Sequence, residues 1–116
     1  MQSEQLNLPV TGSEKKRLNL SNEIYLFQNY PDPFTMTTFI SFTIPDSPHT
    51  HNQFQRVTLK IFDSSGKEIS SLLNDHRLPG YYDIEFSRGD LPAGTYYYEL
   101  IVGSFHREVK KMNLQN

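Results

Sequence analysis

The chain has 116 residues, which is the length of one domain. Its 11 Lys and Arg residues and 13 Asp and Glu residues give a formal net charge of −2. This charge argues against a protein that binds nucleic acid through its phosphates. The chain contains no cysteine, which excludes disulfides, thiolate metal sites and a cysteine nucleophile. No stretch approaches about 18 consecutive apolar residues, so the sequence predicts no transmembrane segment.

The first 23 residues are polar and lack a sustained apolar period. We predict that residues 1–23 form a flexible linker or arm and that residues 24–116 form one domain. The first residues also lack the apolar run after a basic start that defines a secretory signal peptide. We therefore expect either a protein that stays inside the cell or one part of a longer exported protein.

From residue 24 onward, short alternating runs of apolar and polar residues are separated by turn-forming residues. The alternation is clearest over 38–44 (TFISFTI) and 95–102 (TYYYELIV). The last run predicts a bulge near Lys110 and Lys111, because the apolar Val109 and Met112 have opposite parity. Strands are expected over residues 24–27, 38–44, 56–63, 67–73, 81–86, 95–102 and 105–114.

No helix is expected between these strands, and each strand can bury only one face. Two sheets must therefore face one another across a common core. The sequence predicts an all-β fold, an antiparallel immunoglobulin-like β-sandwich of about seven strands.

The titratable side chains form no recognisable catalytic set. There is no Gly-x-Ser-x-Gly turn and no glycine-rich phosphate loop, so we expect no enzyme activity and no cofactor. His49 and His51, in the polar loop 46–55, are spaced to share a metal ion with Asp46 nearby. No third ligand is fixed by the sequence, and we predict solvated histidines and no metal site.

Three consecutive tyrosines at 96–98 must project alternately from their strand. Tyr96 and Tyr98 are expected in the core with their hydroxyls at its rim, which leaves Tyr97 facing outward. Tyr81 has the outward parity in its own strand, so Tyr81 and Tyr97 are a candidate aromatic binding patch. Ordinary packing at the rim is the alternative for both side chains.

Residues 25–34 (YLFQNYPDPF) resemble the L-x-Q-N-Y-P-N-P-F opening of the type A C-terminal sorting domains of the bacterial type IX (Por) secretion system. Residues 37–40 (TTFI) fit the T-T-x-I that follows it, and 57–69 (VTLKIFDSSGKEI) are similar to the family's V-x-L-x-I-Y-D-x-x-G-R-E-V hairpin. Residues 91–98 (LPAGTYYY) match its L-P-A-G-x-Y-x-Y motif, and 110–114 (KKMNL) resemble its closing strand. The pattern is also close to the immunoglobulin-like module of the flagellar hook-capping protein.

The resemblance covers about residues 25–114 in the family's order, with three mild departures and one larger one. Asp32, Phe62 and Lys67 stand where the family has Asn, Tyr and Arg, and the loop 46–55 looks several residues longer than usual.

The resemblance implies a non-catalytic signal that directs a cargo protein through the type IX system to the cell surface or the medium. The implied partners are the outer-membrane translocon, its shuttle protein and a sortase-type cysteine protease, with cleavage in the arm before Ile24. The chain would then be the C-terminal part of a larger precursor that travels through the periplasm. The residues expected to be recognised, or to shape recognised turns, are Gly66, Lys67, Glu68, Pro92, Gly94, Lys110 and Lys111.

An exposed last strand would serve as the docking edge, and the same edge could pair two copies into a dimer. Residues beyond about Asn113 are expected to matter for export and little for folding. Two other functions remain open at this point: an adhesive module that binds carbohydrate or protein through Tyr81 and Tyr97, and a passive structural module.

Overall fold

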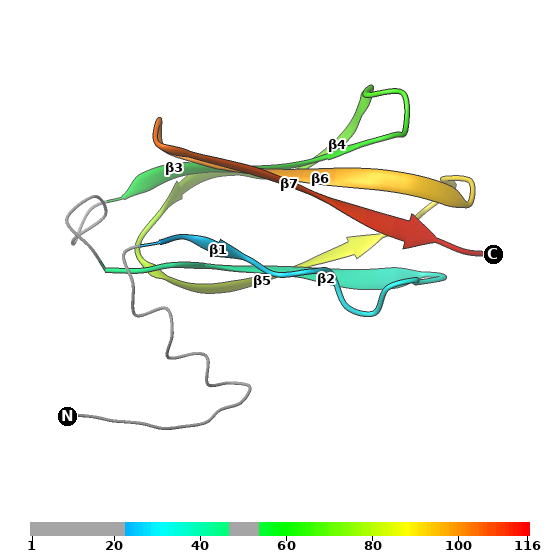
Figure 1. Cartoon of the computed structure of the whole chain (residues 1–116), viewed down its shortest axis with the longest axis horizontal. Coiled ribbons are helices and arrows are strands. Elements are labelled where there is room, and N and C mark those ends of the chain that lie inside the picture. The colour runs from blue at the N-terminus through cyan, green and yellow to red at the C-terminus, as the bar shows by residue number, and fades with distance from the viewer. Residues whose placement is uncertain (1–22, 47–53) are drawn as a thin grey trace.

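Seven antiparallel strands in two facing sheets make up the computed structural model, which describes residues 23–46 and 54–116 (Figure 1). No helix occurs within these ranges. His49 and His51 lie outside the described residues, as does the predicted arm up to residue 22. The strands are β1 (Tyr25–Leu26), β2 (Thr37–Ile44), β3 (Gln55–Phe62), β4 (Glu68–Arg77), β5 (Gly80–Ser87), β6 (Gly94–Val102) and β7 (His106–Leu114).

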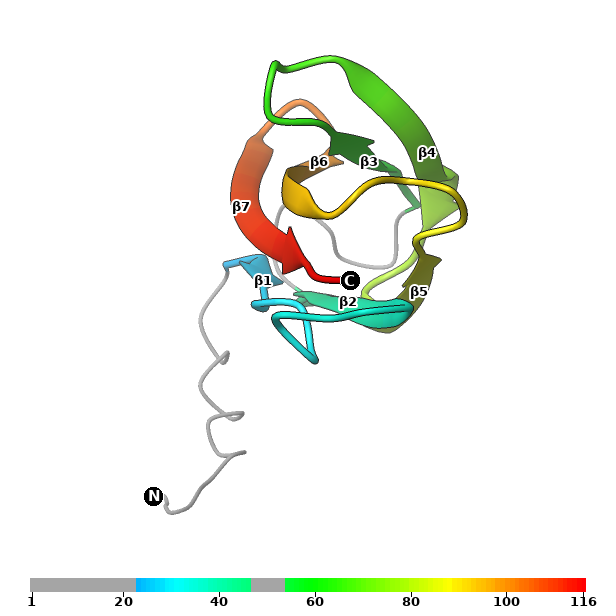
Figure 2. The ribbon, with the colours of Figure 1, turned by 90° about the vertical axis from the view of Figure 1, so that its right-hand side faces the viewer.

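One sheet has the strand order β1-β2-β5 and the other the order β4-β3-β6-β7. The view along the long axis shows the two sheets as separate layers, with β1 beside β7 at one margin and β4 above β5 at the other (Figure 2). In constant-type immunoglobulin domains the fourth strand belongs to the sheet of the first two strands. Here β4 pairs with β3 instead, which gives a sheet of three strands and a sheet of four.

The core consists of the inward side chains of both sheets, as the alternation predicts. Ile40, Phe42 and Ile44 of β2 belong to the same core cluster as Leu59 of the opposite sheet and are at most 1% exposed. Tyr96 and Tyr98 are both buried, which confirms the expected phase of β6. The remaining core residues are Ile24, Leu26, Phe34, Val57, Ile61, Leu73, Phe86, Leu100, Val102, Met112 and Leu114.

Strand β7 contains no bulge, contrary to the sequence prediction. Its pairing with β6 runs without a shift from Val102 opposite His106 to Gly94 opposite Leu114. The parity mismatch has another cause: Val109 is 42% exposed on the outer face, and polar residues occupy the inner positions before Met112. The irregularities lie instead between β3 and β4, where the register shifts at Leu59/Lys60 and at Ile61/Phe62.

Candidate functional site: one end of the four-stranded sheet

Four side chains from four strands form a row across the outer face of the four-stranded sheet. Phe62 on β3 pairs with Glu68 on β4 and with Tyr97 on β6, and Tyr97 in turn pairs with Lys111 on β7. Residues directly opposite one another in antiparallel strands project from the same face and lie close together. We call this set, Glu68, Phe62, Tyr97 and Lys111, the outer row.

The outer row has aromatic rings in its middle and a charge at each end. Phe62 and Tyr97 are partly buried, whereas Glu68 and Lys111 are exposed. Glu68 forms an ion pair with Lys60, with Nζ and Oε1 3.4 Å apart. Within the described part of the chain, Lys111 forms no ion pair, so its ammonium group is available to a partner.

The β3–β4 turn next to the outer row is held by the Asp63 carboxylate. This carboxylate accepts hydrogen bonds from the Ser65 hydroxyl and from the backbone N–H groups of Ser65 and Lys67. These bonds, chiefly those from the Ser65 hydroxyl and the Lys67 N–H, lower the pKa of Asp63. Gly66 has φ of 90°, which explains the glycine at this position. Gly66 and Lys67 are therefore presented on a fixed, exposed turn.

The connection from β5 to β6 lies at the same end of the sandwich as this turn and the C-terminus (Figure 1). The Tyr96 hydroxyl donates a 2.6 Å hydrogen bond to the carbonyl oxygen of Pro92 and so fixes the connection to the start of β6. Gly94 has φ of 154° and pairs with Leu114 of β7. The structure thus brings the predicted residues of both turns and of the last strand to one end of the fold.

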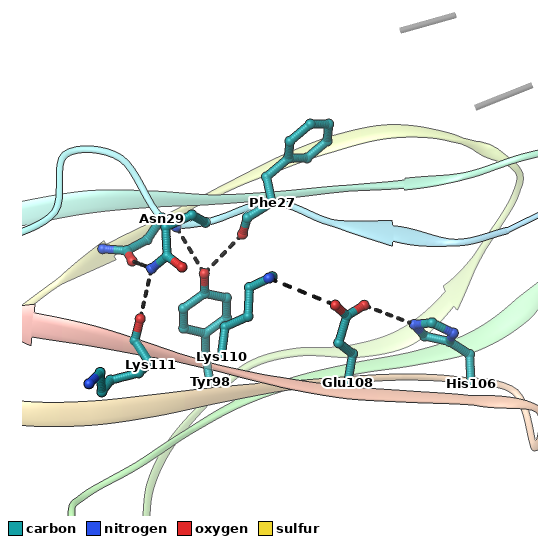
Figure 3. Close-up of polar contacts among 8 residues, drawn as sticks. Phe27, Asn29, Tyr98, His106, Glu108, Lys110 and Lys111 are labelled. Atoms are coloured by element: carbon teal, nitrogen blue, oxygen red, sulfur yellow. Dashed lines mark hydrogen bonds and ion pairs between the residues drawn. The ribbon is translucent and has the colours of Figure 1, made fainter. Parts of the chain in front are cut away.

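The two adjacent lysines of β7 point to opposite faces. Lys111 projects from the outer face, whereas Lys110 projects toward the side of β1, where its Nζ lies 3.9 Å from Oε2 of Glu108 (Figure 3). Oε1 of the same carboxylate lies 3.3 Å from Nε2 of His106. A partner at the outer face would therefore meet Lys111 and not Lys110.

Tyr81 and Tyr97 do not form a shared patch, which corrects the sequence prediction. Tyr81 pairs with Thr43 in the three-stranded sheet, while Tyr97 belongs to the other sheet, so their outward rings lie on opposite faces of the sandwich. The alternation along a strand shows from which face of its own sheet a side chain projects. It does not show to which of the two sheets the strand belongs. The aromatic neighbours of Tyr81 are instead Phe27, at a ring-centroid distance of 6.4 Å, and beyond it Tyr25, 4.6 Å from Phe27.

The segment with two prolines before β2 fastens the last strand, a role that the sequence reasoning missed. The Asp32 carboxylate accepts the Asn113 N–H at 2.9 Å, and the Gln28 amide donates to the Lys111 carbonyl oxygen at 2.7 Å. The Phe34 N–H donates to Asn113 O at 3.0 Å, and Phe34 O accepts the Gln115 N–H at 2.8 Å. We call residues 28–34 the proline corner; it covers the edge of β7 from Lys111 onward.

The Tyr98 hydroxyl connects the proline corner to the opposite sheet. It accepts the Asn29 N–H and donates to the Phe27 carbonyl oxygen, both at 2.9 Å (Figure 3). Burial raises the pKa of Tyr98 to about 12, with a smaller contribution from the negative charges of Asp32 and Glu108, while the Asn29 bond acts in the opposite direction. In the sequence, the Gln-Asn-Tyr-Pro run was noted only for its resemblance to a family motif. It gave no indication that this segment would bond to Tyr98.

Arg88 holds three segments together and carried no sequence signal. Its guanidinium donates to the carbonyl oxygens of Leu91 at 2.8 and 3.3 Å, Thr35 at 3.0 Å and Gln115 at 3.0 Å. The β5–β6 connection, the segment just before β2 and the residues after β7 thus meet at one cation.

The residues after Asn113 are part of the fold, contrary to the expectation that they matter little for folding. Leu114 is 3% exposed in the core, and the backbone of Gln115 is bonded at both its N–H and its carbonyl oxygen. The contacts of Gln115 depend on Phe34 and Arg88, which are distant in sequence.

No group of three or more His, Cys, Asp or Glu side chains that could hold a metal ion occurs among residues 23–46 and 54–116. In the same ranges no helix is long and apolar enough to cross a membrane.

No family model and no curated protein matches this chain. A solved structure, the sensor domain of the anti-sigma factor RsgI4 of Pseudobacteroides cellulosolvens, superposes with a TM-score of 0.56 at 19% sequence identity. The superposition covers 82% of this chain and 96% of that chain. At this identity the similarity establishes the fold, and the chain is an all-β sandwich of two antiparallel sheets.

Proposed function

We propose that this chain is a non-catalytic C-terminal sorting domain that directs a cargo protein through the type IX secretion system. The observation that carries the proposal is the outer row, because Glu68 from the hairpin motif and Lys111 from the last-strand motif flank the same two aromatic rings. Motifs that are about 40 residues apart in the sequence contribute to one surface. This gives the ordered motifs a common purpose beyond folding.

The outer row has the chemistry of a protein-recognition surface. Binding surfaces of this kind concentrate their energy in partly buried aromatic and cationic side chains, with a polar rim around them. Phe62 and Tyr97 would supply the apolar contact, and Lys111 the charge that orients the partner. Gly66 and Gly94 act by shaping the two neighbouring turns.

The proposed partners are the outer-membrane translocon and its shuttle protein, followed by a sortase-type cysteine protease that acts before Ile24. The cargo is the polypeptide joined to the N-terminal side of the domain, and export would proceed from the periplasm to the cell surface. In this proposal the domain performs no chemistry of its own.

The proposal is tested by export of a fluorescent protein that carries a periplasmic signal peptide and is fused in front of residues 1–116. In a bacterium with a working type IX system, we expect fluorescence outside the outer membrane and its loss in a translocon mutant. Lys111→Glu and Tyr97→Ala should each reduce export by about tenfold, the effect of losing one interfacial hot spot. Arg56→Ala, on the same outer face at the other end of β3, is the matched control and should export normally.

Folded cargo that stays in the periplasm with the unaltered domain would exclude the proposal. Normal export of both Lys111→Glu and Tyr97→Ala would show that export does not depend on the outer row.

A second function, an adhesive module, is favoured by the aromatic cluster of Tyr25, Phe27 and Tyr81. These rings are 54%, 38% and 62% exposed on the outer face of the three-stranded sheet, and exposed aromatic rings suit contact with sugar rings or apolar side chains. The Thr43 hydroxyl, between Tyr25 and Tyr81 in the sheet, has no hydrogen-bond partner among the described residues. Retention on a glycan array that is lost in Tyr81→Ala would support this function, and absence of any retention would exclude it for carbohydrates.

A further inference from the structure

The edge of β7 is closed along only part of its length. The Asn113 N–H is bonded to Asp32 and its carbonyl oxygen to Phe34, so the backbone groups of Asn113 point away from β6. In an antiparallel pair this direction alternates, which points the N–H and C=O groups of Arg107 and Val109 away from β6 as well. Within the described chain nothing bonds to these four groups. The open edge is therefore Arg107–Val109, just before the part that the proline corner covers.

The inner face beside this open edge is polar, although the rest of the inner face is core. His106, Glu108 and Lys110 occupy inward positions of β7 and keep side-chain exposures of 24%, 35% and 31%. The facing strand β1 has only two residues, and Figure 3 shows the three side chains pointing toward it. Charged groups at core positions imply that water, or a polar partner, reaches this margin of the sandwich.

The outer side of the open edge is cationic. Arg107 and Lys111 flank Val109 on the outer face, and the Arg107 side chain is 66% exposed although its guanidinium pairs with Glu99 at 2.6 Å. We propose that the open edge accepts an extended segment of another protein as an added strand, and that this segment carries carboxylates opposite Arg107 and Val109, from where they reach the outer-face side chains of Arg107 and Lys111. Backbone hydrogen bonds would give the affinity and the opposite charges the choice of partner.

A second copy of this chain is a poor occupant of the same edge. Antiparallel pairing of two β7 strands about Val109 would place Arg107 of each copy opposite Lys111 of the other, where the proline corner already covers the edge. Like charges directly opposite one another destabilise a strand pair. An edge-strand dimer in this register is therefore disfavoured at β7, and an acidic strand from a different protein is the better occupant.

The test uses residues 1–116 in solution and a peptide of about nine residues in which Thr and Glu alternate, with the Thr–Lys peptide as its counterpart. We expect the Thr–Glu peptide to shift the NMR amide signals of Arg107 and Val109 and to slow their hydrogen exchange, and the Thr–Lys peptide to do neither. Val109→Pro removes an outward N–H and no bond to β6, and proline is tolerated in edge strands. This variant should weaken binding by about tenfold.

The matched control is Glu85→Pro on the edge strand β5. Ser41 accepts a bond from Phe27, so Asp83 and, by alternation, Glu85 point their backbone groups away from β2. Glu85→Pro should leave binding unchanged. Lys111→Glu should reverse the preference toward the Thr–Lys peptide, and it keeps the test valid if Val109→Pro fails to fold.

Equal binding of both peptides, or signals that shift on β5 in place of β7, would overturn the proposal. Because binding is measured with the isolated chain, its outcome is independent of whether the domain supports export.

Discussion

Replacing Tyr98 by Phe should destabilise the fold through the lost hydroxyl alone, because the buried ring is retained. The hydroxyl bridges the Asn29 N–H and the Phe27 carbonyl oxygen at 2.9 Å each, and the whole side chain is 0% exposed. The variant leaves a buried donor, the Asn29 N–H, and a partly buried acceptor, the Phe27 carbonyl oxygen, without this partner. We expect the free energy of unfolding to fall by about 2–3 kcal/mol.

The same hydroxyl should make the stability depend on alkaline pH. Burial raises the pKa of Tyr98 from 10.0 to about 12, so the unfolded chain loses this proton before the folded one. The stabilisation is fully present below pH 10 and is lost as the pH rises through 12. The difference between the two pKa values corresponds to about 3 kcal/mol.

The assay is urea unfolding followed by circular dichroism at about pH 8 and about pH 11.5. The unaltered chain should lose more stability between these pH values than Tyr98→Phe, since the other tyrosines titrate in both. Tyr82→Phe is the control: its hydroxyl donates to Leu78 O at an exposed position, and its loss should cost less than about 1 kcal/mol. Parallel pH curves for the unaltered chain and Tyr98→Phe would refute the reasoning.

Three further changes test the contacts around the site by the same unfolding assay. Arg88→Ala removes four hydrogen bonds and should lower the free energy of unfolding by about 2 kcal/mol. Its control, Arg56→Ala, loses a single exposed bond to Asn74 and should lower it by less than about 0.5 kcal/mol. Equal losses for the two variants would contradict the role of Arg88. Leu114→Ala should cost about 2–4 kcal/mol because the side chain is 3% exposed, and a loss below about 1 kcal/mol would show that the end of β7 is dispensable. Gly66→Ala should cost about 1 kcal/mol from its φ of 90° alone, since no atom lies within 4 Å of an added Cβ; an unchanged midpoint would mean that the turn relaxes.

The sequence allowed the strands and their inward faces to be predicted because both are local properties. Ile40, Phe42 and Ile44 alternate with polar residues, and one buried face follows directly from that period. The same reasoning placed Tyr96 and Tyr98 in the core. Turn residues then separated the strands, and the two-sheet architecture followed from the need to cover each apolar face.

The candidate site could be predicted only residue by residue, because its assembly depends on strand pairing. Lys111, Glu68 and Tyr97 were each identified, but nothing in the local pattern indicates that Phe62 joins them across β3. Tyr81 was wrongly grouped with Tyr97 for the same reason. Arg88 was missed because its partners are backbone carbonyl oxygens, which any residue type can supply.

The contacts of the last strand determine which experiments can separate recognition from folding. Gln115 is bonded to Phe34 and Arg88, and Leu114 lies in the core, so shortening the chain at this end removes packing and hydrogen bonds together. A truncated domain that fails in export would then report on unfolding as much as on a lost signal. Lys111 differs, because its side chain is exposed on the outer face while its backbone stays fixed by Gln28. Substitutions at Lys111 therefore test recognition by a partner while the contacts that hold the fold remain in place.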